Sequence, residues 1–313
     1  MNRLLVAEAL LLAALWGAAY LFMRMAAPDF GAVPLMAVRV SAAAAILVPI
    51  AIVRGEWQAA HEYPKEILVI AIVNSALPFV LYGYAAQHTS AGLSSILNAT
   101  APLWGALIAT AWTRKRPSNG QLLGLVAGFA GVATVVLNRQ GGDGSLHMST
   151  ATVAACLVGA ISYGFAANYS KMRLQKVPAL TLAAGSQLAA ALLLAGPAVF
   201  TWPHAVPPAK AWTAAVALAI LCTGVTQILF FRLIARLGAT SAFSIGFLIP
   251  VFGMLWGTIL LGESVTIPMV IGTAIIIAGT TLASGLVTAV PVPWRTARVS
   301  QRQDARSDTM AGH

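Results

Sequence analysis

Few side chains in this 313-residue sequence have the types and spacing that covalent or metal chemistry requires. The sequence has no serine-nucleophile motif, no His-Glu-x-x-His zinc motif, no phosphate-binding loop and no pair of aspartates within an apolar run. Cys156 and Cys222 lie inside apolar runs, which indicates small buried residues rather than a disulfide or a zinc site. The histidines fall in predicted loops or in the tail: His61, His88, His147, His204 and His313. These observations argue against an enzyme, a metal site or a bound cofactor.

Arg39 is the most informative polar residue, because it lies inside a long apolar run. A charged side chain is costly in hydrocarbon, so such residues are candidates for function. Three roles are open for Arg39. In the first role it binds a substrate carboxylate or acts in a gate. In the second it forms a structural ion pair or carbonyl contact, and in the third it extends to the nearer membrane surface. Glu8, about one turn into the first run, favours an interfacial or arginine-paired position over proton coupling, which is kept as an alternative.

Other polar residues and prolines occupy single helix faces and are candidates for the wall of a substrate cavity. Asn74, Pro78 and Tyr82 are spaced at i, i+4 and i+8, and Asn98 and Pro102 are also four residues apart. Proline frees backbone carbonyls, which neighbours or cavity water must satisfy. The further candidates are Trp16, Tyr20, Asn168, Gln187, Gln227, Phe247 and Pro250. Helix packing or an interfacial belt is the alternative role for the aromatic residues, and interhelical hydrogen bonding is the alternative for Asn74, Asn98 and Gln227.

Long apolar helices must position these candidates, because the sequence is 59% hydrophobic and only 9% charged. A soluble domain contains about 25% charged residues, so this composition excludes a soluble fold. Apolar runs are found at 4–25, 34–53, 66–87, 91–112, 119–137, 151–170, 178–200, 210–231, 239–261 and 267–288. We therefore expect an all-α polytopic membrane protein with ten transmembrane helices. The first run is longer than the core of a typical signal peptide and is expected to remain as a helix.

The basic residues predict the orientation of these helices. Most of the 19 lysines and arginines, Arg114 and Arg116 among them, fall on the side of the membrane that holds the N-terminus. The positive-inside rule then places both termini in the cytoplasm, as expected for an even number of spans in the inner, or plasma, membrane. Anionic lipid accounts for the net charge of +10, so a nucleic-acid partner is not expected.

The two halves of the sequence are related by a shift of 148 residues. This shift pairs Pro102 with Pro250, Gly124 with Gly272 and Gly131 with Gly279, and it pairs Arg39 with Gln187. Residues 1–138 are expected to form one five-helix repeat and residues 151–288 the other, with a linker at 139–150 and a disordered cytoplasmic tail at 289–313. Because five is odd, the second repeat enters the membrane from the opposite side. Inverted repeats of this kind are typical of transporters that open one central site alternately to each side.

Several short motifs follow one another in order along the chain. They are Leu15-Trp16-Gly17, Arg39 with the alanine run after it, Gly238-Ala239-Thr240-Ser241-Ala242, Ile249-Pro250-Val251-Phe252 and Leu260-Leu261-Gly262-Glu263. Together with the five-plus-five pattern, these motifs make residues 5–288 resemble the EamA type of the drug/metabolite transporter superfamily. The resemblance implies a ten-helix carrier, commonly an exporter of amino acids, related metabolites or small toxic compounds. The chain departs from the family at Lys115, where an acidic residue often matches Glu263.

These observations predict an alternating-access secondary transporter that exports amino acids or related small metabolites. Its expected partners are a small-molecule substrate and the lipid bilayer, and the sequence gives no signal for an oligomeric state. Import of small metabolites and a facilitative, channel-like permease are the alternative functions. A channel is less favoured because the sequence has no repeated carbonyl-filter or charged-ring pattern.

Overall fold

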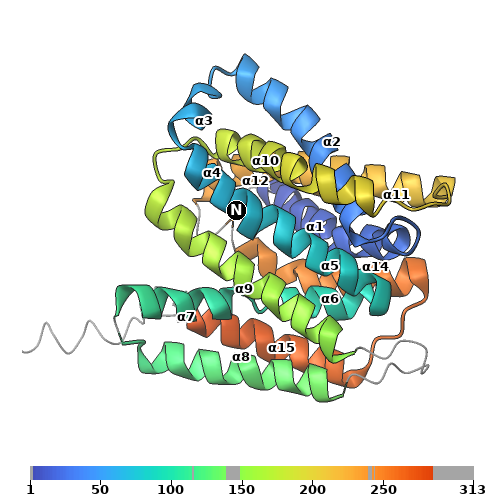
Figure 1. The fold of residues 1–313 in the computed structure, drawn as a ribbon. Helices are drawn as coiled ribbons and strands as arrows, with labels where there is room; N and C mark the ends of the chain where they lie inside the picture. The colour runs from blue at the N-terminus through green and yellow to red at the C-terminus, as the bar shows by residue number, and fades with distance from the viewer. Residues whose placement is uncertain (1–2, 115, 139–148, 239–241, 243, 285–313) are drawn as a thin grey trace, which may run out of the picture.

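The computed structural model describes residues 3–114, 116–138, 149–238, 242 and 244–284, and these form helices joined by short connections (Figure 1). Most of the predicted linker, the predicted tail, Lys115 and part of the 238–242 motif lie outside the described residues. The first half contains α1 (Arg3–Phe30), α2 (Ala32–Val53), α3 (Gln58–Glu62), α4 (Pro64–Ile70), η1 (Ala71–Ala76), α5 (Leu77–His88), α6 (Ala91–Asn98), α7 (Ala101–Thr113) and α8 (Asn119–Leu137). The second half contains α9 (Thr150–Arg173), α10 (Ala179–Phe200), α11 (Ala209–Ala219), η2 (Ile220–Val225), α12 (Thr226–Leu237), η3 (Ile245–Leu248), α14 (Ile249–Leu261) and α15 (Ile267–Ala283).

Local sequence signals fix the ends of several helices. Ser90, Ser118 and Ser149 precede α6, α8 and α9, and each side chain accepts a hydrogen bond from a backbone N–H of the first turn. Gly31 separates α1 from α2 with a φ of 78°, a conformation that glycine adopts without strain. These signals produce the abrupt reversals between consecutive helices.

Eight helical segments are long and apolar enough to cross a membrane. They cover Arg3–Phe30, Ala32–Val53, Pro64–His88, Ala91–Thr113, Asn119–Leu137, Thr150–Arg173, Ala179–Phe200 and Ala209–Leu237. The described parts of the last two expected spans, Ile245–Leu261 and Ile267–Ala283, are shorter apolar helices. The structure thus supports a multi-pass helical membrane protein, with eight full-length spans and two shorter apolar helices among the described residues.

The two halves share irregularities at equivalent positions. The third span of each repeat contains a π-helical segment, η1 in one half and η2 in the other. The fourth span of the first half is interrupted between α6 and α7, and α7 begins at Ala101, which is equivalent to Ile249 at the beginning of α14. Proline occupies the first turn of both helices, where its missing N–H costs no hydrogen bond.

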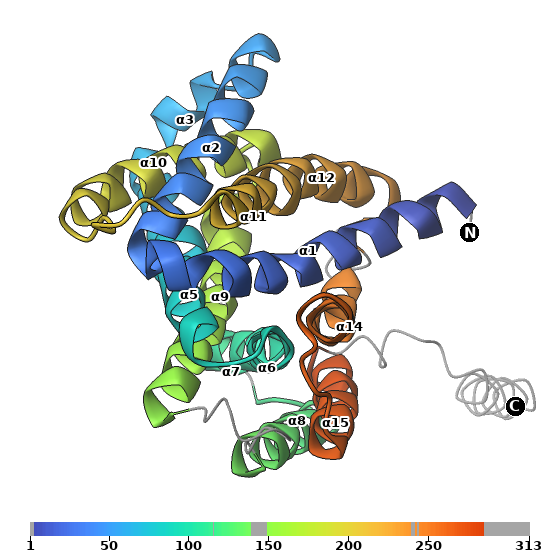
Figure 2. The ribbon, with the colours of Figure 1, turned by 90° about the vertical axis from the view of Figure 1, so that its right-hand side faces the viewer.

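Contacts between the halves follow the same equivalence. α2 packs against its counterpart α10, and α8 packs against its counterpart α15 (Figure 2). α1 packs against the third and fourth spans of the second half, mainly through α11 and α14. Its counterpart α9 packs against the third and fourth spans of the first half, mainly through α5 and α7. Glycines bring α8 and α15 together, because a Cβ on Gly124 would meet the backbone of Gly279 and a Cβ on Gly131 would meet that of Gly272. The halves therefore form one bundle with an approximate internal two-fold relation.

Candidate functional site

Arg39 lies at the contact between the two halves. It projects from α2, and only 7% of its surface is exposed. Its Nε donates a hydrogen bond of 2.9 Å to Thr223 Oγ1 in η2, and its Nη1 lies 3.9 Å from Met23 Sδ in α1. The guanidinium carbon lies 3.7 Å from the centre of the Phe79 ring, which is a cation–π contact. Helices of both repeats thus surround the guanidinium.

No carboxylate of the described residues forms an ion pair with Arg39. Its neighbours are a hydroxyl, a thioether and an aromatic ring, which solvate a cation only in part. A buried charge is strongly stabilised by a hydrogen-bonded partner of opposite charge. This environment can therefore bind an anionic group of a ligand.

Gln187 occupies the equivalent position in the second half. It is 1% exposed on α10, and its Nε2 donates a hydrogen bond of 3.1 Å to Ser75 Oγ in η1. Ser75 is the equivalent of Thr223, so each second helix binds a hydroxyl in the π-helical segment of the other half. Gln187 Oε1 is buried and has no hydrogen-bond partner among the described residues. The two equivalent contacts therefore differ in charge, with a cation on one side and an amide on the other.

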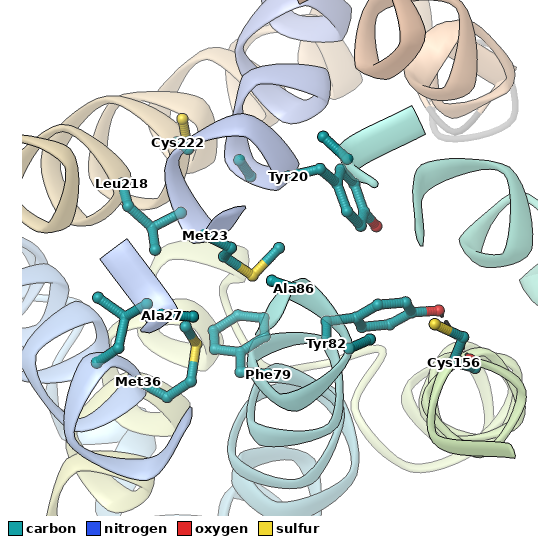
Figure 3. Packing of buried hydrophobic residues seen from close by; sticks show 14 of the residues in the cluster. Tyr20, Met23, Ala27, Met36, Phe79, Tyr82, Ala86, Cys156, Leu218 and Cys222 are labelled. Carbon is teal, nitrogen blue, oxygen red and sulfur yellow. Dashed lines mark hydrogen bonds between the residues drawn. The ribbon is translucent and has the colours of Figure 1, made fainter. Parts of the chain in front are cut away.

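Three tyrosines pack in the same cluster as two of the residues that contact Arg39. Met23 and Phe79, which both contact Arg39, lie side by side in the middle of Figure 3, with Tyr20 and Tyr82 beside them. The rings of Tyr20 and Tyr82 meet edge to face at 5.7 Å, and the ring of Tyr163 stacks on Tyr82 at 6.1 Å. The Tyr82 hydroxyl donates a hydrogen bond of 3.0 Å to the backbone carbonyl of Cys156. This cluster gives the candidate site an aromatic wall.

The other candidate residues predicted from the sequence differ in their contacts and burial. Asn168 Nδ2 donates hydrogen bonds of 2.9 Å to the carbonyls of Gly105 and Gly164, so it joins α9 to α7. Trp16 packs on Phe230, with ring centres 5.2 Å apart. Pro78 and Pro250 are buried, whereas the candidates that are half-buried are Asn74, Asn98, Pro102, Gln227 and Phe247. The contacts thus bring Tyr20, Arg39 and Tyr82 into one cluster and place Asn168 and Trp16 in separate helix contacts.

Three residues of the cluster were not expected from the sequence. Thr223 and Ser75 are small hydroxyl residues in apolar runs, and only their equivalence under the repeat could have marked them as a pair. Tyr163 could not be predicted as a site residue, because the sequence shows only that it is a polar aromatic residue in the sixth expected span. All three are brought to the site by helices distant in sequence from their partners.

Charged contacts lie towards the ends of the spans. Glu8 Oε1 lies 2.9 Å from Arg232 Nη2 and 3.6 Å from Arg236 Nη1, which confirms the expected arginine pairing. Glu263, just after α14, accepts hydrogen bonds of 3.0 Å from the Ala91 N–H at the beginning of α6 and lies 3.9 Å from Arg24 Nε. Burial raises the pKa of the Glu263 carboxyl, while these N–H groups and Arg24 oppose the shift. Each contact joins the first half to the second.

Open surface grooves along Trp212–Leu221 and Pro49–Arg54 contain none of the candidate residues. Arg39 and Gln187 are both buried, so the candidate site is closed in this structure.

Comparisons with known proteins agree with this architecture. "Uncharacterized transporter YoaV" of Bacillus subtilis (strain 168) is 22% identical over 274 residues, covering 85% of this chain and 91% of the relative. A "Probable terminal-alkyne amino-acid exporter" of Streptantibioticus cattleyicolor is 25% identical over 278 residues, covering 85% of this chain and 89% of the relative. A solved structure titled "Crystal structure of protein" has a TM-score of 0.63 at 19% identity, covers 93% of this chain and 100% of its own, and supports the fold alone.

The sequence pattern of the EamA-like transporter family matches the chain twice, over residues 4–137 and 150–285. The two matches span both halves and leave only the chain ends and the segment between them unmatched. The chain therefore belongs to the EamA-like transporter family.

Proposed function

We propose that the chain is an alternating-access secondary transporter that exports amino acids or related small metabolites. The observation that carries this proposal is the buried, positively charged Arg39, which contacts both halves and forms no ion pair with a described carboxylate. In the proposed mechanism Arg39 binds the carboxylate of the substrate. The tyrosine cluster of Tyr20, Tyr82 and Tyr163 then contacts the rest of the molecule.

Alternating access follows from the proposed arrangement of ten spans in two inverted repeats, with both termini in the cytoplasm of the inner membrane. Equivalent contacts in the two halves support an exchange of conformations between them. Glu8 with Arg232 would close the cytoplasmic end, and Glu263 with the beginning of α6 would close the opposite end. Opening one contact while the other stays closed would expose Arg39 to one side at a time.

Export rather than import is favoured by the similarity to the "Probable terminal-alkyne amino-acid exporter" of Streptantibioticus cattleyicolor, which aligns with 85% of this chain. Import remains the second candidate for direction. A channel-like permease is the second candidate for mechanism. Efflux from preloaded cells, measured beside uptake into the same cells, separates export from import. Net accumulation of the compound in expressing cells would favour the importer.

Counterflow in proteoliposomes tests the carrier mechanism. Purified protein is reconstituted and supplied with amino acids and small organic metabolites, with and without a pH gradient. A carrier exchanges external label faster when the vesicles are preloaded with the unlabelled compound, whereas a channel does not. A proton-coupled carrier additionally accumulates substrate against its gradient when the pH gradient is imposed. Label entry that preloading does not accelerate would contradict alternating access.

Arg39→Gln is the informative variant in the same assay, and Arg54→Gln is its matched control. Both residues lie at α2, but Arg54 is exposed at the helix end. We expect Arg39→Gln to abolish counterflow while membrane insertion and thermal stability stay near those of the wild type. Loss of folded protein in Arg39→Gln would instead favour a structural role for the guanidinium.

A further inference from the structure

The Gln187 side chain, at the position equivalent to Arg39, carries a buried acceptor that no described residue satisfies. Gln187 Oε1 has no donor among the described residues, although the side chain is 99% buried and its Nε2 is already held by Ser75. A buried acceptor without a donor is unfavourable, because it has lost its hydrogen bond to water and gained none in return. Such an atom is stabilised when a ligand supplies an N–H or O–H group.

Gln187 and Arg39 both contact the third span of the first half. Gln187 binds Ser75, and Arg39 lies over the ring of Phe79, four residues further along the same span. The residues that they contact, Ser75 and Phe79, are about one helical turn, on the order of 6 Å, apart along the span. A small ligand whose carboxylate and N–H donor are adjacent has the size for two contacts one helical turn apart, since each hydrogen bond adds about 3 Å.

We infer that Gln187 is a specificity-determining residue, whose Oε1 accepts a hydrogen bond from an ammonium group on the substrate. This inference rests on the proposed function, in which Arg39 binds the neighbouring carboxylate. One cation and one neutral acceptor complement a zwitterion such as an α-amino acid. A second carboxylate on the substrate cannot donate a hydrogen bond to Gln187 Oε1, because both groups are acceptors. Dicarboxylates are therefore rejected at this position.

A series of three ligands separates the two contacts. L-Phenylalanine carries both groups, 3-phenylpropionate lacks the ammonium, and phenethylamine lacks the carboxylate. The aromatic ring is chosen because Tyr20, Tyr82 and Phe79 surround the site. Affinities for the purified full-length protein are measured by isothermal titration calorimetry in detergent. We expect wild-type protein to bind 3-phenylpropionate on the order of 10- to 100-fold more weakly than L-phenylalanine.

Gln187→Met keeps the length of the side chain and removes the acceptor. In this variant the ratio of affinities for L-phenylalanine and 3-phenylpropionate should fall towards one, while phenethylamine stays weaker than both. In Arg39→Met the ratio of affinities for L-phenylalanine and phenethylamine should instead fall towards one. A residue with only a structural role would change all affinities together and leave these ratios unchanged.

Gln187→Glu tests the same contact if Gln187→Met fails to fold. A carboxylate at this position should raise the preference for L-phenylalanine over 3-phenylpropionate above the wild-type ratio. Equal binding of these two ligands to wild-type protein, or binding of neither, overturns the inference. Counterflow of other compounds would then leave the proposed function standing, whereas absence of counterflow for every compound would remove the proposed function itself.

Discussion

Asn168 and Asn74 are both amide residues on membrane helices, but their surroundings differ. Asn168 Nδ2 is held by two backbone carbonyls, at Gly105 and Gly164, whereas the Asn74 amide forms no hydrogen bond to another described residue. Removing a satisfied interhelical hydrogen bond in a membrane protein costs about 1 kcal/mol. The first amide therefore has the environment of a structural residue, and the second has that of a group available to a ligand.

Asn168→Ala is expected to lower stability by about 1 kcal/mol and to leave counterflow by the remaining folded protein near the wild-type rate. Asn74→Ala is the matched variant and is expected to leave stability unchanged. Thermal unfolding in detergent and counterflow in proteoliposomes measure the two effects. A loss of stability in Asn74→Ala as large as that in Asn168→Ala would show that both amides are structural.

Glu263 makes the stability of the fold depend on pH. Burial raises the pKa of its carboxyl above the ordinary value of 4.5, so the folded protein binds this proton more tightly than the unfolded chain does. The contribution of Glu263 to stability is therefore greatest below pH 4.5 and decreases as the pH rises through the raised folded-state pKa. Glu263→Gln removes the titration and retains an oxygen that can accept from the Ala91 N–H.

Thermal unfolding between pH 4 and pH 8 tests this linkage. We expect the stability of the wild type, relative to Glu263→Gln, to decrease as the pH is raised above about 4.5. Glu263→Gln itself should lack this component of the pH dependence. A constant difference between the two proteins over the whole range, or an increase with pH, would contradict the raised pKa.

At the scale of single residues, the sequence predicted polar groups but not their partners. Arg39 was identifiable because a charged residue in an apolar run is unusual. Its partner Thr223 was not, because small hydroxyl residues are common in membrane helices and the pair is separated by 184 positions. Tertiary contacts of that separation depend on how the helices pack, which periodicity alone does not determine.

Among the elements, α8 and α15 show how glycines determine a helix pair. A Cβ on Gly124 would collide with the backbone at Gly279 and Ala283, and backbone atoms cannot move aside as a flexible side chain can. Gly120, one turn earlier on α8, is different, because its nearest neighbour would be Ser118 Oγ at 4.0 Å. Two glycines four residues apart on one helix thus differ in whether they tolerate a side chain.

Gly124→Ala is expected to destabilise the protein by about 1–3 kcal/mol through overpacking. Gly120→Ala, the same substitution on the same helix, should be neutral or stabilising by up to about 1 kcal/mol, since alanine favours helix. Thermal unfolding of the two purified variants measures both effects. Equal destabilisation would mean that α8 and α15 do not meet at Gly124.

The irregular elements were only partly predictable from the sequence. Residues 91–112 were expected as one span, whereas the structure divides them at Ala99 and Thr100 into α6 and α7. Pro102 explains the division, because a proline is tolerated in the first turn of a helix and disrupts its interior. The π-helical segments η1 and η2 contain no proline, and no sequence signal marks both of them.

For the molecule as a unit, the proposed inversion of the two halves is the feature on which the proposed alternating access depends. Gly55 follows α2, and its equivalent Pro203 follows α10. Figure 1 shows α3, just after Gly55, at the opposite end of the bundle from the α10–α11 connection. Basic residues favour the cytoplasmic side, and Arg54 and Lys65 flank the first connection, whereas Lys210 is the single basic residue beside the second. Equivalent connections should therefore lie on opposite sides of the membrane.

An epitope inserted after Gly55 should bind antibody only after the cells are permeabilised, and one inserted after Pro203 should bind it in intact spheroplasts. A reporter fused after His313 should report the cytoplasm in the same orientation. Wild-type counterflow by each tagged protein would show that the insertions preserve the fold. Exposure of both internal epitopes on one side would mean that the halves are parallel. The two halves could then not exchange roles across the membrane, because a parallel copy of each helix would face the same side as its counterpart.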